Sequence, residues 1–208
     1  MARRYADLLA DLRTAYDGGA SQRDQLSKYP WKVEERAAFL ARLREAGSQR
    51  LLEIGAGTGQ DSVFFTEHGL SVVAIDLSPA MVARCVEKGL DARVLDFTGL
   101  TSEFPAASFD AVWSMNCLQH VPTADLPPIV AQIRAMLRPG GLFYFGSWGG
   151  DGTEGLLEDD SHTPPRFFAW RTLAQLESAL ADSFTVVDTH TVFPGTRNPF
   201  HALTARAK

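Results

Sequence analysis

The chain has 208 residues, of which 45% are hydrophobic and 22% charged, and its formal net charge at pH 7 is −5. These proportions are ordinary for a globular protein and predict one domain with a full core. Lysine and arginine are scattered rather than gathered in a basic stripe, which argues against nucleic acid as a partner. No apolar run approaches the roughly 18–20 residues that a membrane span needs.

The two cysteines, Cys85 and Cys117, lie far apart and form no CxxC pair. This usage suits a reducing compartment and argues against a disulfide framework and a cysteine-ligated zinc site. The first residues lack the apolar stretch of a secretory signal. These features predict a cytoplasmic protein that binds neither a metal nor a membrane.

The first fifty residues are predicted to form a helical cap over residues 1–49. Apolar residues recur at three- and four-residue spacing over 3–16 and over 32–46, and Gly47 ends the second helix. The polar segment between them, 17–30, is predicted to be a mobile flap.

From Arg50 onward the pattern changes to alternating strands and helices. Short apolar runs predict buried parallel strands at 51–54, 71–75, 92–95, 110–115 and 142–147. Helices are predicted between them at 60–68, from the Ser78-Pro79 start to Gly89, and at about 125–137.

The end of the chain has a different pattern. Thr172 and Gln175 form a capping box that begins a helix. The runs 184–192 and 200–206 have no helix between them, so they are predicted to form an antiparallel hairpin at one edge of the sheet.

Repeated strand-helix units with short links predict an α/β fold. We expect a doubly wound, Rossmann-like sheet, mostly parallel, with helices on both faces. Residues 50–148 would form the cofactor-binding core, and residues 149–208 a loop on the acceptor side followed by the edge hairpin. Ligands of such sheets bind beyond the carboxyl ends of the strands.

The strongest signal is the glycine-rich segment 51–61, LLEIGAGTGQD. Its glycines let the backbone turn sharply and approach a ligand closely, and they lead into the N-terminus of a helix. Asp76 ends the next predicted strand, at the spacing expected of an acid that binds a ribose. The segment therefore predicts a nucleoside-containing cofactor.

Two cofactors compete for this turn, a nicotinamide dinucleotide and S-adenosylmethionine. The dinucleotide pattern places its third glycine where this chain has Gln60. Glu53, Asp76 and Asp96 all lie at the carboxyl ends of predicted strands. Three carboxylates would repel a pyrophosphate but would suit a ligand with an ammonium and a sulfonium, which favours S-adenosylmethionine.

Several blocks of the sequence together resemble the class I S-adenosylmethionine-dependent methyltransferases, in particular the branch that acts on small molecules. The blocks lie at 51–61, 72–82, 94–97, 108–121 and 137–148. The resemblance implies a seven-stranded sheet whose last strand is antiparallel. It also implies methyl transfer to a small-molecule acceptor by in-line displacement at the methyl carbon.

The resemblance further implies a set of cofactor-binding residues. They are Glu53, Gly55, Ala56, Gly57, Gly59, Asp61, Asp76, Leu77, Met81, Asp96, Phe97 and Asn116. The glycines would line the methionine part, and Asp76 would hold the ribose hydroxyls. Leu77 and Met81 would flank the adenine, while Asp96 and Phe97 would reach its amine edge.

His120 is the candidate catalytic residue. It would lie near the reacting centre with Asn116, and its unperturbed pKa suits a general base. A histidine in this turn can also serve only to position its neighbours. Cys117 is disfavoured as a nucleophile because it lacks the preceding proline of cytosine-type methyltransferases.

The acceptor is expected to bind under the loop 149–168, whose glycines permit motion. The candidates for the acceptor wall are Tyr16, Trp148, His162, Arg166 and Phe167. The alternative is a solvated surface loop in which Arg166 pairs with a neighbouring acid.

Two other functions stay open on the sequence alone. One is an NAD(P)-dependent dehydrogenase on the same fold, and the other is a cofactor-binding domain without turnover. The sequence does not tell the identity of the acceptor, which atom is methylated, or whether the protein is a monomer or a homodimer.

Overall fold

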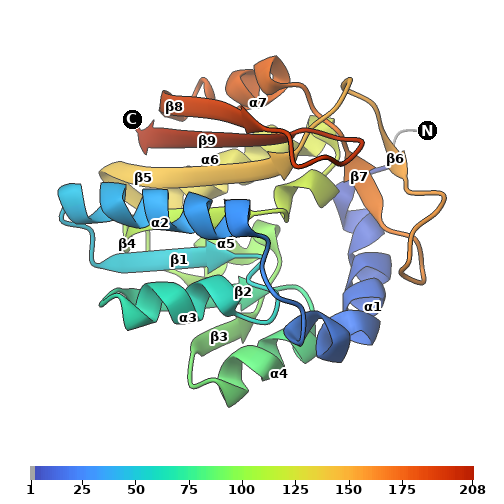
Figure 1. The fold of residues 1–208 in the computed structure, drawn as a ribbon. Helices are drawn as coiled ribbons and strands as arrows, with labels where there is room; N and C mark the ends of the chain where they lie inside the picture. Colours follow the sequence, from blue (N-terminus) through green and yellow to red (C-terminus); the bar gives the residue numbers. More distant parts are fainter. Residues whose placement is uncertain (1–2) are drawn as a thin grey trace.

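The computed structural model describes residues 3–208, so residues 1–2 of the predicted cap lie outside it. Its centre is a seven-stranded sheet in the order β3-β2-β1-β4-β5-β9-β8 (Figure 1). The strands are β1 (Arg50–Ile54), β2 (Ser71–Asp76), β3 (Asp91–Val94), β4 (Phe109–Met115), β5 (Leu137–Trp148), β8 (Phe184–Val192) and β9 (Phe200–Ala207).

The sheet confirms the predicted doubly wound topology. β1 lies inside the sheet and pairs in parallel with β2 and β4. β9 pairs antiparallel with both β5 and β8, which confirms the predicted hairpin and the antiparallel last strand. The chain order reverses at β1, so the carboxyl ends of β1 and β4 flank the switch point where ligands bind in such sheets.

Helices cover both faces of the sheet. The helices are α1 (Tyr5–Asp24), α2 (Pro30–Glu45), α3 (Gln60–Glu67), α4 (Pro79–Glu87), α5 (Leu100–Glu103), α6 (Leu126–Met136) and α7 (Leu173–Leu180), with short 3-10 turns η1 (Phe97–Gly99), η2 (Leu118–His120) and η3 (Thr123–Asp125). α2 and α3 bury Phe39 and Phe65 against one face. α6 and α7 bury Ile133 and Leu176 against the other.

The alternation of β1 explains how one strand serves both cores. Leu51 packs with the α2 and α3 side, whereas Leu52 and Ile54 pack on the opposite face. All three are at most 1% exposed. Successive side chains of a strand point to opposite faces, so the residues of β1 contribute to the cores on both sides of the sheet. Glu53 is thereby buried near the end of the strand.

The predicted flap over 17–30 is wrong for its first part, because α1 is continuous to Asp24. α1 runs across the ends toward which β1 and β5 point (Figure 1). The polar residues in its second half are held by tertiary contacts. Asp17 accepts a hydrogen bond from the backbone N–H of Ala80 at 3.1 Å, and Asp24 pairs with Lys88.

The segment 149–168 also contains structure that its composition did not predict. Two three-residue strands, β6 (Glu154–Leu156) and β7 (Phe167–Ala169), pair antiparallel and lie beyond the end of β5 near α1 (Figure 1). Strands this short have too few residues to display a period of two. The intervening turn 157–166 is thereby held close to α1.

Among the helices of residues 3–208, none is both long and apolar enough to cross a bilayer. The same part of the chain contains no group of three His, Cys, Asp or Glu side chains placed to hold a metal ion.

Candidate functional site

Two adjoining pockets open beyond the carboxyl ends of β1, β2 and β4. The first, the α1 pocket, contains about 550 Å³ of space between Tyr5, Leu12 and Tyr16 of α1 and the ends of the strands. The second, the lysine pocket, contains about 720 Å³ and is bordered by Lys28 and Lys32. Both pockets share the residues Arg23, Gly55, Met115 and Asn116.

The three motif glycines have three different surroundings. All have positive φ, at 67°, 56° and 79° for Gly55, Gly57 and Gly59. A Cβ on Gly55 would lie 2.2 Å from Cys117 Cβ, and one on Gly59 would lie 2.6 Å from Leu90 Cδ1. Of the three, only Gly57 leaves room for a Cβ, whose first neighbour would be Arg23 Nε at 3.4 Å, an ordinary contact with a flexible side chain.

Three N–H groups of the glycine turn are bonded within the protein. Ala56 N–H donates to the carbonyl of Ile75 at 3.0 Å, and Gly59 N–H donates to Ala56 at 3.0 Å. Gly57 N–H donates to Asp76 Oδ2 at 2.8 Å. A pyrophosphate would need such donors free, so this turn is poorly suited to a dinucleotide.

Asp76 is held at the end of β2, where the sequence predicted it. Besides the bond from Gly57, its Oδ1 accepts the backbone N–H of Ser78 at 2.9 Å. The carboxylate lines the α1 pocket, and burial raises its pKa above the ordinary value. Each carboxylate oxygen has a further lone pair, so Asp76 can accept hydrogen bonds from a ligand's hydroxyls.

The apolar part of the α1 pocket lies beside Asp76. Leu77 and Phe97 line it, as predicted for the residues around a nucleobase. The ring of Tyr5 stacks on Phe97 with centroids 5.7 Å apart. Tyr5 comes from α1, about ninety residues away in the chain, and the sequence pattern did not point to it.

Three predicted cofactor residues lie outside the walls of both pockets. Gly59 packs against the core, and Met81 is buried at 1% exposure. Asp96 caps η1, where its Oδ1 accepts the backbone N–H of Thr98 at 2.7 Å. The structure brings Glu53 and Asp76 to the pockets but does not bring Asp96 with them, so the ring of three carboxylates is incomplete.

Glu53 and Asp61 lie side by side in the lysine pocket. Glu53 is 4% exposed and accepts a hydrogen bond from Ser62. Burial, and then the neighbouring Asp61, raise the pKa of Glu53 to about 8. Asp61 accepts the indole N–H of Trp113 at 3.2 Å and pairs with Lys28 Nζ at 2.6 Å.

Asn116 follows β4 and lies where the two pockets meet. Its φ of 60° is in the left-handed region, which asparagine tolerates better than most residues. Its Oδ1 is buried and has no hydrogen-bond partner among residues 3–208. A buried acceptor without a partner is costly, so the site favours a ligand with a donor at this point.

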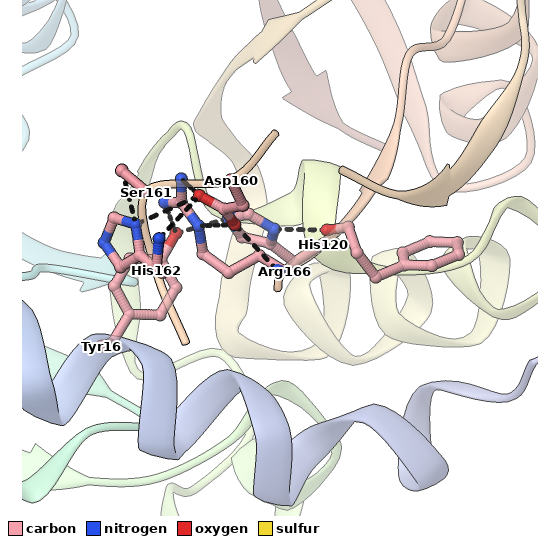
Figure 2. Close-up of polar contacts among 7 residues, drawn as sticks. Tyr16, His120, Asp160, Ser161, His162 and Arg166 are labelled. Carbon is pink, nitrogen blue, oxygen red and sulfur yellow. Dashed lines mark hydrogen bonds and ion pairs between the residues drawn. The ribbon is translucent and has the colours of Figure 1, made fainter. Parts of the chain in front are cut away.

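His120 belongs to a cluster with Tyr16 and Arg166 (Figure 2). His120 Nδ1 lies 2.7 Å from the carbonyl oxygen of Phe167. A carbonyl only accepts, so Nδ1 carries the proton and Nε2 accepts the Tyr16 hydroxyl at 2.6 Å. Burial, with Arg166 and Arg23 nearby, lowers the pKa of His120 to about 3.

The acceptor-side candidates fall into two groups. Arg166 binds Asp160 through two nitrogens, at 2.8 and 2.9 Å, as the alternative of a paired arginine predicted. Arg166 also donates to the Tyr16 hydroxyl at 3.2 Å, and His162 lies against the same tyrosine (Figure 2).

Trp148 and Phe167 lie elsewhere. Phe167 is buried at 4% exposure and contributes its carbonyl to His120. Trp148 packs in a separate aromatic cluster with Trp31 and Phe200, at centroid distances of 5.9 and 5.8 Å. Neither side chain lines the α1 pocket or the lysine pocket.

Three cations at the border of the site were not predicted from the sequence. Arg23, Lys28 and Lys32 all reach the lysine pocket. They come from the end of α1, the link after it and the start of α2, a polar region without a recognised motif. The spacing of these three cations in the sequence matches no known binding motif. They meet at the glycine turn only because α1 packs across the ends of the strands.

Comparison with known proteins relates this geometry to a family. Residues 51–141 match the family model described as a methyltransferase domain. Over 110 residues the chain is 39% identical to a ubiquinone biosynthesis O-methyltransferase of Xanthomonas axonopodis pv. citri, covering 50% of this chain and 44% of the relative. Over 124 residues it is 31% identical to a 27-O-demethylrifamycin SV methyltransferase of Amycolatopsis mediterranei. This match covers 56% of this chain and 44% of the relative.

The structural match is more extensive than these sequence matches. A 1,6-didemethyltoxoflavin-N1-methyltransferase of Burkholderia thailandensis, solved with bound 1,6-didemethyltoxoflavin and S-adenosylhomocysteine, matches with a TM-score of 0.76. The match covers 100% of this chain and 92% of that one at 25% identity. By contrast, the chain spans less than half the length of the curated relatives named above.

Proposed function

We propose that this chain, which belongs to the class I S-adenosylmethionine-dependent methyltransferases, transfers the methyl group of S-adenosylmethionine to a small-molecule acceptor. The observation that carries this proposal is the position of Asp76. Its carboxylate is fixed by two backbone N–H groups at the edge of a pocket whose other wall is apolar. That arrangement suits a nucleoside, with ribose hydroxyls on Asp76 and the base beside Leu77 and Phe97.

The residues present fit the cofactor at its other end as well. Gly57 lines the α1 pocket, and Asn116 offers a buried acceptor that has no partner among residues 3–208. The ammonium of the methionyl group is a donor that would satisfy Asn116, and Arg23 beside Gly57 would hold the carboxylate. Glu53, Ala56 and Asp61 of the lysine pocket complete this end of the proposed site.

The bound cofactor would supply a methyl group on a sulfonium, which is an excellent leaving group. The protein then has to align the acceptor with the methyl carbon and to exclude water. Such positioning can account for about 7–11 kcal/mol of a barrier. α1 performs both tasks here, because Leu12 and Tyr16 close the α1 pocket from the side opposite the strands.

His120 fits a positioning role better than the role of a general base. A pKa of about 3 makes the ring a weak base at neutral pH. Both ring nitrogens are also bonded, to Tyr16 and to Phe167. We propose that His120 orients the Tyr16 hydroxyl at the wall of the α1 pocket and that the acceptor loses no proton to this histidine.

The cofactor assignment is tested by replacing Asp76. We expect Asp76→Ala to weaken binding of S-adenosylhomocysteine by about 10- to 100-fold, the effect of losing hydrogen bonds to a charged group. Isothermal titration calorimetry measures this directly. Asp91→Ala, an exposed aspartate at the opposite end of the parallel strands, is the matched control and should bind as the wild type does. Unchanged affinity in Asp76→Ala would contradict the ribose assignment.

The reaction itself needs a second measurement. Purified protein is incubated with S-adenosylmethionine labelled in the methyl group and a metabolite extract, and labelled products are identified by mass spectrometry. Binding of S-adenosylhomocysteine without any labelled product would support a domain without turnover. NAD(P)H serves as the competing ligand in a thermal shift assay, because a ligand of the folded state raises the unfolding temperature.

The proposal also covers the cellular location and the oligomeric state of the protein. The free, buried cysteines Cys85 and Cys117 favour a reducing, cytoplasmic location. The oligomeric state that we propose is a monomer or a homodimer.

A further inference from the structure

Two cations border the proposed site without a carboxylate in ion-pair contact. Lys28 pairs with Asp61, and Lys88 pairs with Asp24. Among residues 3–208, the side chains of Arg23 and Lys32 make no hydrogen bond and no ion pair. S-adenosylmethionine brings only one carboxylate, which Arg23 at the glycine turn would bind. Lys32 therefore lacks an anion even in the cofactor complex.

Lys32 is surrounded by aromatic rings and like charges rather than by an anion. Its ammonium lies over the rings of Tyr29, Trp31 and Trp148, at 5.7, 5.2 and 6.0 Å from their centroids, and these contacts favour the charge. Lys32 is also in the first turn of α2, which contains no acidic residue and whose dipole is positive at this end. Burial, then Lys28 and Arg23, lower the pKa of Lys32 to about 8, so it is still charged at neutral pH.

The lysine pocket as a whole is electropositive. Its lining contains three cations, Arg23, Lys28 and Lys32, against two acids. Burial raises the pKa of Glu53, which favours its neutral form, and Asp61 is already paired with Lys28. The sulfonium and ammonium of the cofactor outweigh its carboxylate, so cofactor binding increases the positive charge.

The lysine pocket therefore offers an ammonium that has no anion among the described residues and is flanked by aromatic rings. Resting on the proposed methyl transfer, we infer that the acceptor is a small acid, whose anionic group binds Lys32 beside Trp31 and Trp148.

The test compares acids with their uncharged amides. A panel of hydroxybenzoates and hydroxyphenylacetates, each with its primary amide, is titrated calorimetrically into protein saturated with S-adenosylhomocysteine at pH 7. We expect at least one acid to bind ten or more times tighter than its amide. Lys32→Met should abolish that difference, and Lys32→Arg should retain part of it. Lys208→Met, a lysine bonded to Ala181 and distant from the pocket, should behave as the wild type does.

The affinity for S-adenosylhomocysteine separates this inference from the proposed function. Lys32→Met should bind S-adenosylhomocysteine within about twofold of the wild type, which also shows that the variant folds. If every acid and its amide behave alike, including the case in which neither binds, the acidic acceptor is overturned while cofactor binding stands. A large loss of S-adenosylhomocysteine affinity in Lys32→Met would instead assign Lys32 to the cofactor and overturn the inference. Failure of the wild type to bind S-adenosylhomocysteine would contradict the proposed function itself.

Discussion

His120 shows how a buried side chain can have its protonation state set by its neighbours. The Phe167 carbonyl requires a proton on Nδ1, and the Tyr16 hydroxyl donates to Nε2. A second proton on the ring would displace the Tyr16 hydrogen bond in a buried site. The neutral ring is therefore the form that the folded protein stabilises, and the pKa falls to about 3.

This shift makes stability depend on pH. Between the unfolded pKa near 6.5 and the folded value near 3, the unfolded chain binds a proton at His120 and the folded protein does not. The free energy of unfolding should therefore fall as pH is lowered from 7 to 4.5, by about 2 kcal/mol from this residue alone. Urea unfolding at both pH values measures the loss, which should be smaller in His120→Gln. The exposed His68→Gln is the control, and equal pH slopes in all three proteins would contradict the shift.

The glycine motif illustrates what the sequence could predict at this scale. The spacing of residues 55, 57 and 59 correctly predicted a turn between strand and helix. It could not distinguish the glycine that faces a ligand from those that make room for protein. Gly55 and Gly59 are required because Cys117 and Leu90 approach them from distant parts of the chain, so of the three only Gly57 leaves room for a side chain.

At the scale of elements, the turn 157–166 is organised around one carboxylate. Asp160 accepts hydrogen bonds from the side chain and backbone of Arg166 and from the backbone of His162. Burial alone would raise the pKa of Asp160, but the Arg166 bonds hold it well below its usual range. This pair fixes the guanidinium that reaches Tyr16 on α1, so the turn and α1 are joined at the α1 pocket.

Removing this charge should loosen the turn. We expect Asp160→Asn to speed amide hydrogen exchange over residues 157–166 by roughly tenfold, because one of the stronger, charge-assisted hydrogen bonds is lost. Mass spectrometry of peptides from this segment measures the exchange. Asp151→Asn is the matched control, since Asp151 is exposed and bonds only within its own turn, to Thr153. Exchange that is equally fast in wild type and Asp160→Asn would show that Arg166 is not what holds the turn.

Elements with strong local patterns were predictable, and those held by tertiary contacts were not. The Ser78 cap of α4 and the capping box of Thr172 are present where the sequence placed them. The second half of α1 has a polar sequence that looks like a linker. It is helical because Asp17 and Asp24 are bound by α4 and the residue after it, contacts that no local pattern reveals.

At the scale of the whole molecule, α1 is attached at both ends to the body of the protein. Near its start, Tyr5 N–H and Arg4 bind Asp125 at 2.7 and 2.9 Å. The second half of α1 is bonded to α4 through Asp17. Leu12, Tyr16 and Arg23 of the same helix line the α1 pocket. A ligand in the α1 pocket would therefore be enclosed between the helix and the sheet.

Cofactor binding should stabilise α1 more than the distant hairpin. At S-adenosylhomocysteine concentrations 100 times the Kd, exchange of amides in residues 12–23 should slow by up to about 100-fold, because the helix can open only after the ligand leaves. Peptides from β8 and β9 provide the internal control and should show a much smaller change. Equal protection of both regions would mean that the ligand stabilises the fold without contacting α1.

The place of β9 between β5 and β8 affects how this protein is made. β8 leaves the ribosome before β9, yet its neighbour in the sheet is β9. Until residues 200–207 emerge, a nascent chain would carry an unpaired β8 and an open edge on β5, and such edges readily pair with other chains. The molecule would thus be most prone to aggregate before β9 is in place.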